Sequence, residues 1–252
     1  MAGSHSKNVS VLIPVYSEVD SLAETVRLTL ENLGGRTHEI LLLVHEKSRP
    51  ECWELCQRLA QDIPQVQVHR QQRYPGQGYA YRQGIEIARG DLLLFLNSDL
   101  ETEPRHIGRL LERMETGAYD LVVASRWARG SAFDRASYGK LKWVLNFCVQ
   151  HAFALLTLTP ISEFTFAYKL ARRDLFQRVV WEGTGHEFAF ESTLKPVLLG
   201  WRVSQVPTSW VGRREGTSHQ PFWRNLRHIM LGLRLVARRY FNPKLFRREN
   251  LN

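Results

Sequence analysis

The chain has 252 residues, of which 44% are hydrophobic and 23% charged, a composition typical of one large globular domain and not of a disordered chain. Lys and Arg outnumber Asp and Glu by 34 to 25, and the whole excess lies after residue 200, where eleven basic residues stand against two acidic ones. Three cysteines, Cys52, Cys56 and Cys148, match neither a disulfide framework nor a zinc-binding pattern. Their spacing excludes a disulfide-rich secreted domain and a zinc-binding domain.

The first half of the chain alternates between short apolar runs and amphipathic segments. Such alternation predicts an α/β fold with right-handed crossovers and a mixed, mainly parallel sheet covered by helices on both faces. Ser21 is the expected N-cap of the first helix. The predicted strands are 9–15, 39–44, 66–69, 92–96 and 121–125, and the predicted helices are 22–33, 51–61, 77–88 and 105–115.

The run at 92–96 is the most informative of these elements. It holds five consecutive apolar residues, which predict a strand buried on both faces, and Asn97, Ser98 and Asp99 follow directly. Ligands of open α/β sheets bind at the carboxyl ends of the strands. Asp99 and Glu101 would project to the same side of an extended chain, so we expect them to share one divalent cation.

Two later segments carry apolar residues at helical spacing. The segment 143–161 is interrupted by polar residues and closed by Pro160, so it predicts a helix that is buried or lies in an interface, not a membrane span. The segment 222–241 places arginines between aromatic and aliphatic residues. It predicts a basic amphipathic helix that meets anionic lipid headgroups, with packing on its own domain as the alternative.

The first strand is followed by Pro14, Val15, Tyr16, Ser17 and Glu18, without the glycine fingerprint of a dinucleotide-binding turn. Several segments in order instead resemble family 2 glycosyltransferases of the Rossmann-like GT-A fold, particularly dolichol-phosphate mannose synthase and other polyprenyl-phosphate glycosyltransferases. The matching segments are 12–18 (LIPVYSE), 75–91 (PGQGYAYRQGIEIARGD), 97–99 (NSD at the D-x-D position), 125–126 (SR), 162–169 (SEFTFAYK), 187–191 (EFAFE) and 213–218 (RREGTS).

The resemblance implies a GT-A domain over residues 8–220 and a basic, membrane-facing helix and tail over 221–252. It implies Mg²⁺ or Mn²⁺ as cofactor, held by Asp99 and Glu101 against the diphosphate of a UDP- or GDP-sugar. The implied catalytic residues are Asp99, Arg213 and Glu191. The implied nucleotide-binding residues are Pro14, Tyr16, Glu18, Glu46, Gly78, Asn97, Ser98 and Arg126, and the implied acceptor- or phosphate-binding residues are Glu163, Thr165, Lys169, Arg213 and Ser218.

The acceptor decides whether a base is needed. Polyprenyl phosphate, the expected lipid-linked acceptor, presents an anionic oxygen, and its direct attack inverts the anomeric carbon. A saccharide hydroxyl would require a carboxylate base, for which Glu163, Glu187 and Glu191 are candidates. Asn97, Glu46 and Glu163 stand where the family usually has Asp, so weaker metal binding and a diverged, non-catalytic scaffold protein remain alternatives.

No apolar leader and no membrane span is found in the sequence, so we expect a cytoplasmic protein that is peripheral on the cytoplasmic face of a membrane. The expected partners are the nucleoside-diphosphate sugar, the lipid-linked acceptor and the anionic membrane surface. No nucleic-acid motif accompanies the basic C-terminal region, and we expect no nucleic-acid partner.

Overall fold

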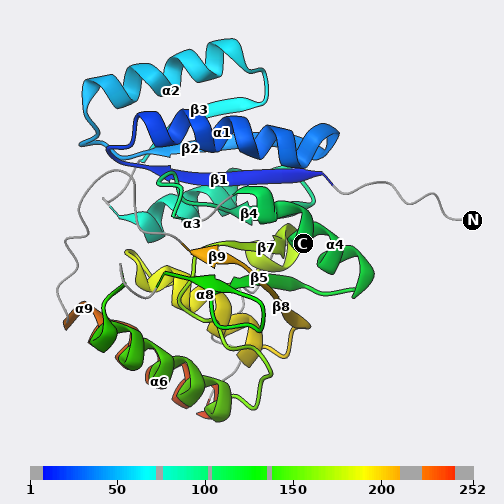
Figure 1. Ribbon diagram of the computed structural model, residues 1–252, viewed down its shortest axis with the longest axis vertical. Helices are drawn as coiled ribbons and strands as arrows, with labels where there is room; N and C mark the ends of the chain where they lie inside the picture. The colour runs from blue at the N-terminus through cyan, green and yellow to red at the C-terminus, as the bar shows by residue number, and fades with distance from the viewer. Residues whose placement is uncertain (1–7, 72–75, 102–103, 135–137, 211–222, 242–252) are drawn as a thin grey trace, which may run out of the picture.

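The computed structural model describes residues 8–71, 76–101, 104–134, 138–210 and 223–241. Its centre is a seven-stranded sheet in the order β3-β2-β1-β4-β7-β5-β8 (Figure 1). A small second sheet pairs β6 with β9 in parallel. The strands are β1 (Val9–Val15), β2 (Thr37–Val44), β3 (Val66–Arg70), β4 (Leu92–Phe95), β5 (Leu121–Ser125), β6 (Ala132–Phe133), β7 (Lys169–Arg172), β8 (Val203–Pro207) and β9 (Ser209–Trp210).

The seven-stranded sheet is parallel except at β7. This strand runs antiparallel to both of its neighbours, β4 and β5, and Leu170 pairs with Leu94 on one side and Val122 on the other. The predicted mixed, mainly parallel sheet is therefore confirmed. The 92–96 run is buried on both faces as predicted, with exposures of 0–1%.

Helices cover both faces of the sheet because alternate side chains of each buried strand point to opposite sides. Val11 and Ile13 of β1 pack with α1, α2 and α4, whereas Leu12 packs with α3, α7 and α8. The helices are α1 (Asp20–Leu33), α2 (Pro50–Asp62), α3 (Gln77–Ile87), α4 (Ile107–Thr116), α6 (Lys140–Leu156), α7 (Arg173–Gln177), α8 (Glu187–Leu198) and α9 (Trp223–Phe241), with short 3₁₀ turns at Gly34–Arg36 and Pro104–His106.

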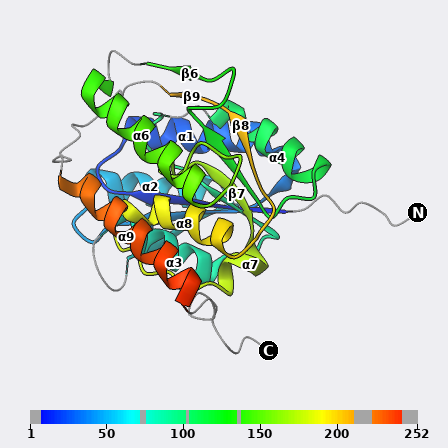
Figure 2. The ribbon, with the colours of Figure 1, turned by 90° about the horizontal axis from the view of Figure 1, so that it is seen from below.

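A third layer lies outside α8. The helices α6 and α9 pack on it through a separate apolar cluster that includes Phe153, Phe190 and Leu235 (Figure 2). A Cβ at Gly232 of α9 would overlap the ring of Phe153, so this glycine lets α9 approach α6 closely. The predicted C-terminal helix is confirmed, and its apolar stripe is partly used in packing on its own domain.

Two local predictions were wrong. Ser21 lies inside α1, which begins at Asp20, and Val19 stands at the N-cap position without a side-chain cap. The helix expected over 143–161 begins earlier, at Lys140, and ends at Leu156. Leu158 has a positive φ of 51°, which no helix continues through.

Candidate active site

The carboxyl ends of β1, β2 and β4 lie side by side because β1 pairs in parallel with both other strands. This topology brings the loops after the three strands to one edge of the sheet. Ser98, just past the end of β4, donates its hydroxyl to the carbonyl oxygen of Pro14 at 3.2 Å, which fastens the loop after β4 to the end of β1.

The loop after β1 forms an open corner with the loop after β2. Tyr16 is 53% exposed, and its ring meets His45 edge to face at a centroid distance of 4.9 Å. Glu46 is exposed next to His45. Partial burial lowers the pKa of His45, while the Glu46 charge opposes the shift. Glu18 accepts hydrogen bonds from the backbone N–H groups of Tyr16 and Ser17, so its carboxylate orders the loop that carries Tyr16.

Asn97 is fixed by α3. Its Oδ1 accepts hydrogen bonds from Gln77 Nε2 at 2.9 Å and from the Tyr81 hydroxyl at 3.0 Å. Burial, and then the nearby Asp99 charge, raise the pKa of Tyr81, so its hydroxyl stays protonated and remains a donor. With its amide oxygen used in this way, the group that Asn97 could still offer a ligand is its NH₂, a donor.

Asp99 and Glu101 are joined by a tight turn, and the expectation of an extended segment was wrong. Leu100 between them has a positive φ of 53°, an uncommon conformation for a branched side chain. The turn lets the Glu101 N–H donate to Asp99 Oδ1 at 3.2 Å. The indole N–H of Trp210 reaches Glu101 Oε2 at 3.4 Å, so β9 also contacts this turn.

The two acidic residues form a sparse but suitable donor set for a divalent cation. Among the described residues, no three His, Cys, Asp or Glu side chains gather into a metal site by themselves. Mg²⁺ in phosphate-transfer sites is held by one or two carboxylates, with substrate phosphates and water completing its shell. Asp99, which is 6% exposed, and Glu101 fit that arrangement, and they would hold Mg²⁺ or Mn²⁺.

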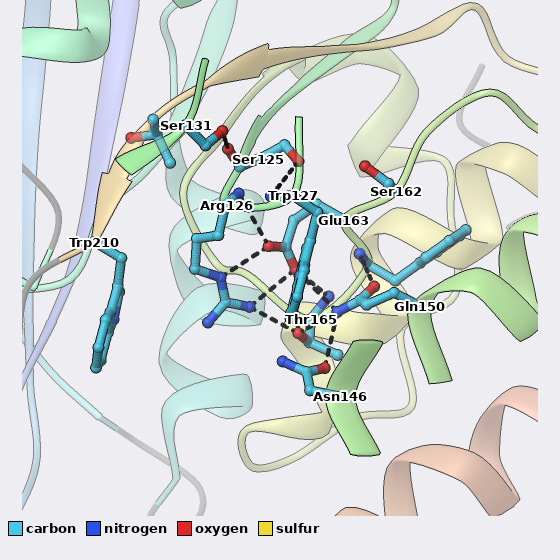
Figure 3. A network of polar contacts seen from close by, with 12 residues as sticks. Ser125, Arg126, Trp127, Ser131, Asn146, Gln150, Ser162, Glu163, Thr165 and Trp210 are labelled. Carbon is cyan, nitrogen blue, oxygen red and sulfur yellow. Dashed lines mark hydrogen bonds and ion pairs between the residues drawn. The ribbon is translucent and has the colours of Figure 1, made fainter. Parts of the chain in front are cut away.

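A buried polar network lies beside this edge (Figure 3). Arg126, which follows β5, donates Nε and Nη2 to the two oxygens of Glu163, and Nη2 also to Thr165 Oγ1 at 2.9 Å. Gln150 of α6 donates Nε2 to both Glu163 and Thr165. Phe166 lies beneath the guanidinium, 4.4 Å from the ring centroid to Cζ.

The network holds Arg126 in its charged form. Burial by itself opposes the charge, but Glu163 outweighs it and raises the pKa of Arg126. The family-like segments 125–126 and 162–169 are therefore in direct contact, and the structure places Arg126, Glu163 and Thr165 together.

Gly78 has a packing reason for its lack of a side chain. A Cβ at this position would lie 2.7 Å from the carbonyl oxygen of Gly183, and one at Gly76 would overlap Thr184. The start of α3 thus lies directly against the 183–185 loop, and the nucleotide-binding role given to Gly78 is not needed to explain it.

Lys169 and Glu191 are buried and make contacts that hold α8 to β7 and to the segment before α8. The Lys169 ammonium is fully buried and donates to Ala189 O, Ser192 Oγ and Thr193 Oγ1 at 2.7–2.8 Å, which ties β7 to α8. Glu191 is fully buried, forms an ion pair with Lys195, and accepts from the backbone N–H groups of residues 182 and 183.

The two remaining site predictions, Arg213 and Ser218, lie outside the described residues. Glu187, the other base candidate, accepts hydrogen bonds from the backbone N–H groups of Thr184 and Gly185 at 2.9 Å. Its carboxylate thus stabilises the loop that meets the start of α3.

A family model described as "Glycosyl transferase family 2" matches residues 10–180, more than half of the chain. The chain belongs to glycosyl transferase family 2. The match begins in β1 and contains the Asn97–Asp99 strand end and the Arg126–Glu163 network, so most of the site described above lies within the matched residues, whereas Glu187, Glu191 and Trp210 follow them.

Curated relatives of this family 2 glycosyltransferase include enzymes named for polyprenyl phosphates. Dolichol-phosphate mannosyltransferase of Pyrococcus furiosus is 26% identical over 88% of this chain and 62% of the relative. Undecaprenyl-phosphate 4-deoxy-4-formamido-L-arabinose transferase of Klebsiella pneumoniae is 30% identical over 86% of this chain and 64% of the relative. Glycosyltransferase AglD of Haloferax volcanii is 26% identical over 80% and 33%, so this chain spans less than two thirds of all three.

Solved structures share the GT-A fold. Glucosyl-3-phosphoglycerate synthase of Mycobacterium tuberculosis, in complex with Mn²⁺, UDP-glucose and phosphoglyceric acid, superimposes with a TM-score of 0.66. The superposition covers 92% of this chain and 79% of that one at 17% identity, which shows the fold alone.

The sequence analysis of this family 2 chain missed several residues that build the site. Gln77 and Tyr81 are four apart on α3, and their spacing shows a common face but not that the face meets Asn97. Gln150 is one of the polar residues that interrupt the apolar segment 143–161, and nothing in that pattern indicates its contact with Glu163. His45 follows β2 directly, and its position at a strand's carboxyl end was the one signal that could have identified it.

Proposed function

We propose that this chain transfers a sugar from a UDP- or GDP-sugar to polyprenyl phosphate, with inversion at the anomeric carbon. The observation that carries the proposal is the state of the three base candidates. Glu163 and Glu191 are fully buried and paired with Arg126 and Lys195. Glu187 is engaged by the backbone N–H groups of Thr184 and Gly185. A saccharide acceptor needs a base that can reach its hydroxyl, whereas a phosphate acceptor does not. The names of the curated relatives support the same acceptor class.

The donor would occupy the edge formed by β1, β2 and β4. Tyr16 and Glu46 offer a ring and a carboxylate to the base and ribose, and Glu18 orders that loop. Asp99 and Glu101 would hold Mg²⁺ or Mn²⁺, which when bound neutralises charge on the diphosphate leaving group. The thermal-shift panel below distinguishes UDP from GDP.

The transfer reaction requires no proton transfer. An oxygen of the acceptor phosphate forms a bond to the anomeric carbon as the bond from that carbon to the donor's β-phosphate oxygen breaks. The nucleoside diphosphate leaves with the electron pair. Arg126 and Thr165, held by Glu163, lie on the side of the site away from Tyr16. Arg126 is 7% exposed and paired, so it would act on the acceptor phosphate through its positive charge.

The acceptor class requires the chain to work at a membrane. No helix in the described part of the chain is both long and apolar enough to cross a bilayer. We propose peripheral attachment to the cytoplasmic face, with the basic helix α9 contributing to it.

A thermal-shift panel tests the donor site. UDP, GDP, CDP and dTDP are compared with and without Mn²⁺ on the wild type and on Asp99→Ala, with Asp62→Ala on the exposed end of α2 as control. Ligand at about 100 times its dissociation constant stabilises by roughly 2.7 kcal/mol, or about 5–10 °C here. We expect a Mn²⁺-dependent shift with one nucleotide that only Asp99→Ala loses. A flat panel with cooperative melting would favour the non-catalytic scaffold.

A product assay then tests the acceptor. The nucleotide sugar selected by the panel is supplied in labelled form with either undecaprenyl phosphate or an oligosaccharide. Label in the organic extract of the first reaction supports the proposal. Label transferred only to the oligosaccharide would instead establish transfer to a hydroxyl.

A further inference from the structure

Helix α6 has two very different faces. Its inner face supplies Asn146, Gln150 and Phe153 to the polar network and to the apolar cluster under α9. Its outer face, together with the residues just past its end, is apolar and exposed, with Leu141 at 71% and Leu155 at 75%. The exposed apolar side chains are Leu141, Val144, Phe147, Leu155, Leu156 and Leu158.

Helix α9 also carries exposed apolar side chains. It lies beside α6 on the same side of the molecule, and the Gly232–Phe153 contact fixes the two helices together (Figure 2). Leu235 points inward and is fully buried, whereas Met230 and Leu233 are 67% and 48% exposed. Arg238 Nη1 donates to both carboxylate oxygens of Glu182 at 2.9 Å, which ties α9 to the segment before α8.

The charge on these helices is of one sign. The sequences of α6 and α9 contain seven Lys and Arg residues and no Asp or Glu. On α9, Arg227, Arg234 and Arg239 are exposed. An exposed apolar face bordered by basic side chains is the composition of a surface that lies in the headgroup region of an anionic bilayer.

We propose that α6 and α9 together form the membrane-docking surface, here called the α6–α9 surface. In it α6 supplies most of the apolar contact and α9 supplies the arginines. The basic helix α9 alone, which the sequence suggested, is thus only part of the attachment. A second copy of this chain would fit poorly, because a twofold interface places the same positive surface against itself, whereas anionic lipid complements it.

This placement bears on the proposed acceptor. Gln150, on the inner face of α6, donates to Glu163 and Thr165 in the Arg126 network. With α6 flat on the bilayer, only about one helix diameter, roughly 10 Å, separates that network from the headgroups. A polyprenyl phosphate could then keep its chain in the membrane while its phosphate lies near the Arg126 network. This last step rests on the proposed function, but docking itself does not.

Vesicle flotation without donor or acceptor tests the docking. Equimolar phosphatidylcholine and phosphatidylglycerol vesicles are compared with pure phosphatidylcholine for the wild type and for the double variant Leu141→Glu with Leu155→Glu. Both leucines are exposed, so the variant should fold. The matched control, Gln57→Glu with Gln61→Glu, adds the same charge to the exposed face of α2, at the opposite end of the molecule (Figure 1).

We expect the wild type and the α2 control to float with the anionic vesicles, and the α6 variant to bind at least about tenfold more weakly. High salt should weaken wild-type binding through the arginines. Equal vesicle binding by the wild type and the α6 variant would overturn the proposal. So would a wild type that does not bind vesicles and is a dimer, if the α6 variant is a monomer. The nucleotide thermal shift of the α6 variant should equal that of the wild type, so failure of docking and failure of the transferase are distinguishable.

Discussion

Arg126 and Glu163 form a bidentate ion pair in the interior, with Nε–Oε2 and Nη2–Oε1 distances of 2.8 and 3.0 Å and side-chain exposures of 7% and 0%. The pair joins the end of β5 to the segment before β7. Both partners keep further hydrogen bonds, to Thr165 and Gln150, so the geometry of this region depends on each of them.

Replacing Glu163 by Gln should destabilise the fold by about 3–5 kcal/mol, because it leaves the buried Arg126 charge without its partner. Glu163→Asp keeps the charge and should cost clearly less, although the shorter side chain loses some contacts. Urea unfolding of the three proteins measures the difference. A Glu163→Gln protein as stable as the wild type would show that solvent or another group already balances Arg126.

Asn97→Asp should tighten Mn²⁺ binding by about tenfold or more in the presence of the nucleotide, since it adds a negative charge next to Asp99. The new carboxylate can still accept from Gln77 and Tyr81, so the local geometry should persist. Titration of Mn²⁺ against the thermal shift gives the affinity. Asn97→Ala, which removes the oxygen without adding charge, is the control, and an unchanged affinity in Asn97→Asp would refute the expectation.

Glu191→Gln should act on stability, because Glu191 pairs with Lys195 where neither side chain is exposed. We expect a loss of about 3–5 kcal/mol in Glu191→Gln, much of it recovered when Lys195 is also replaced by Met. The two single variants and the double variant are compared by urea unfolding. A Glu191→Gln protein of normal stability that binds donor but transfers no sugar would instead identify Glu191 as a base.

Lys169 should make stability rise with pH in the alkaline range. Burial lowers the pKa of Lys169 from its ordinary 10.5 to about 7, with the Glu163 charge opposing the shift. Between these values the unfolded chain binds the proton that the folded chain has released. The free energy of unfolding should therefore increase from pH 7 upward, by at most about 1.4 kcal/mol per pH unit from this group.

The comparison of wild type with Lys169→Met isolates that contribution. Melting is measured from pH 6 to 10, a range set by the pKa values of 7 and 10.5, and the difference between the two proteins should grow in the wild type's favour as pH rises. The exposed Lys47→Met is the control and should follow the wild type. Parallel pH profiles for the wild type and Lys169→Met would mean that the buried amine stays charged.

The sequence predicted the strands best where both faces of a strand are buried. The apolar runs of β1 and β5 predict the bounds of those strands to the residue, because a strand covered on both faces is nearly all apolar, with Ser10 and Ser125 as the exceptions here. In contrast β7, with the sequence KLAR, has a lysine and an arginine at its ends and no apolar run. Its buried Lys169 reaches polar partners on α8, and those partners could not be foreseen from local pattern.

The site residues at strand ends could be predicted from the sequence, whereas the contacts that helix side chains make with them could not. The end of β4 identified Asn97 and Asp99 because strand ends point to ligands in this class of sheet. The turn at Leu100 escaped prediction, since no glycine or asparagine marks its positive φ. The contact of Gln150 with Glu163 depends on how α6 is rotated and packed, which spacing alone does not determine.

The position of β7 has a consequence for synthesis of the chain. In chain order β4 and β5 are consecutive strands of the seven-stranded sheet, but β7, which pairs with both, is synthesised only after α6. Until then one edge of β4 and both edges of β5 lack a partner strand, since β8 follows later still, and such edges are templates for wrong pairing. We infer that productive folding waits for residues 169–172, and that fragments ending before them should aggregate.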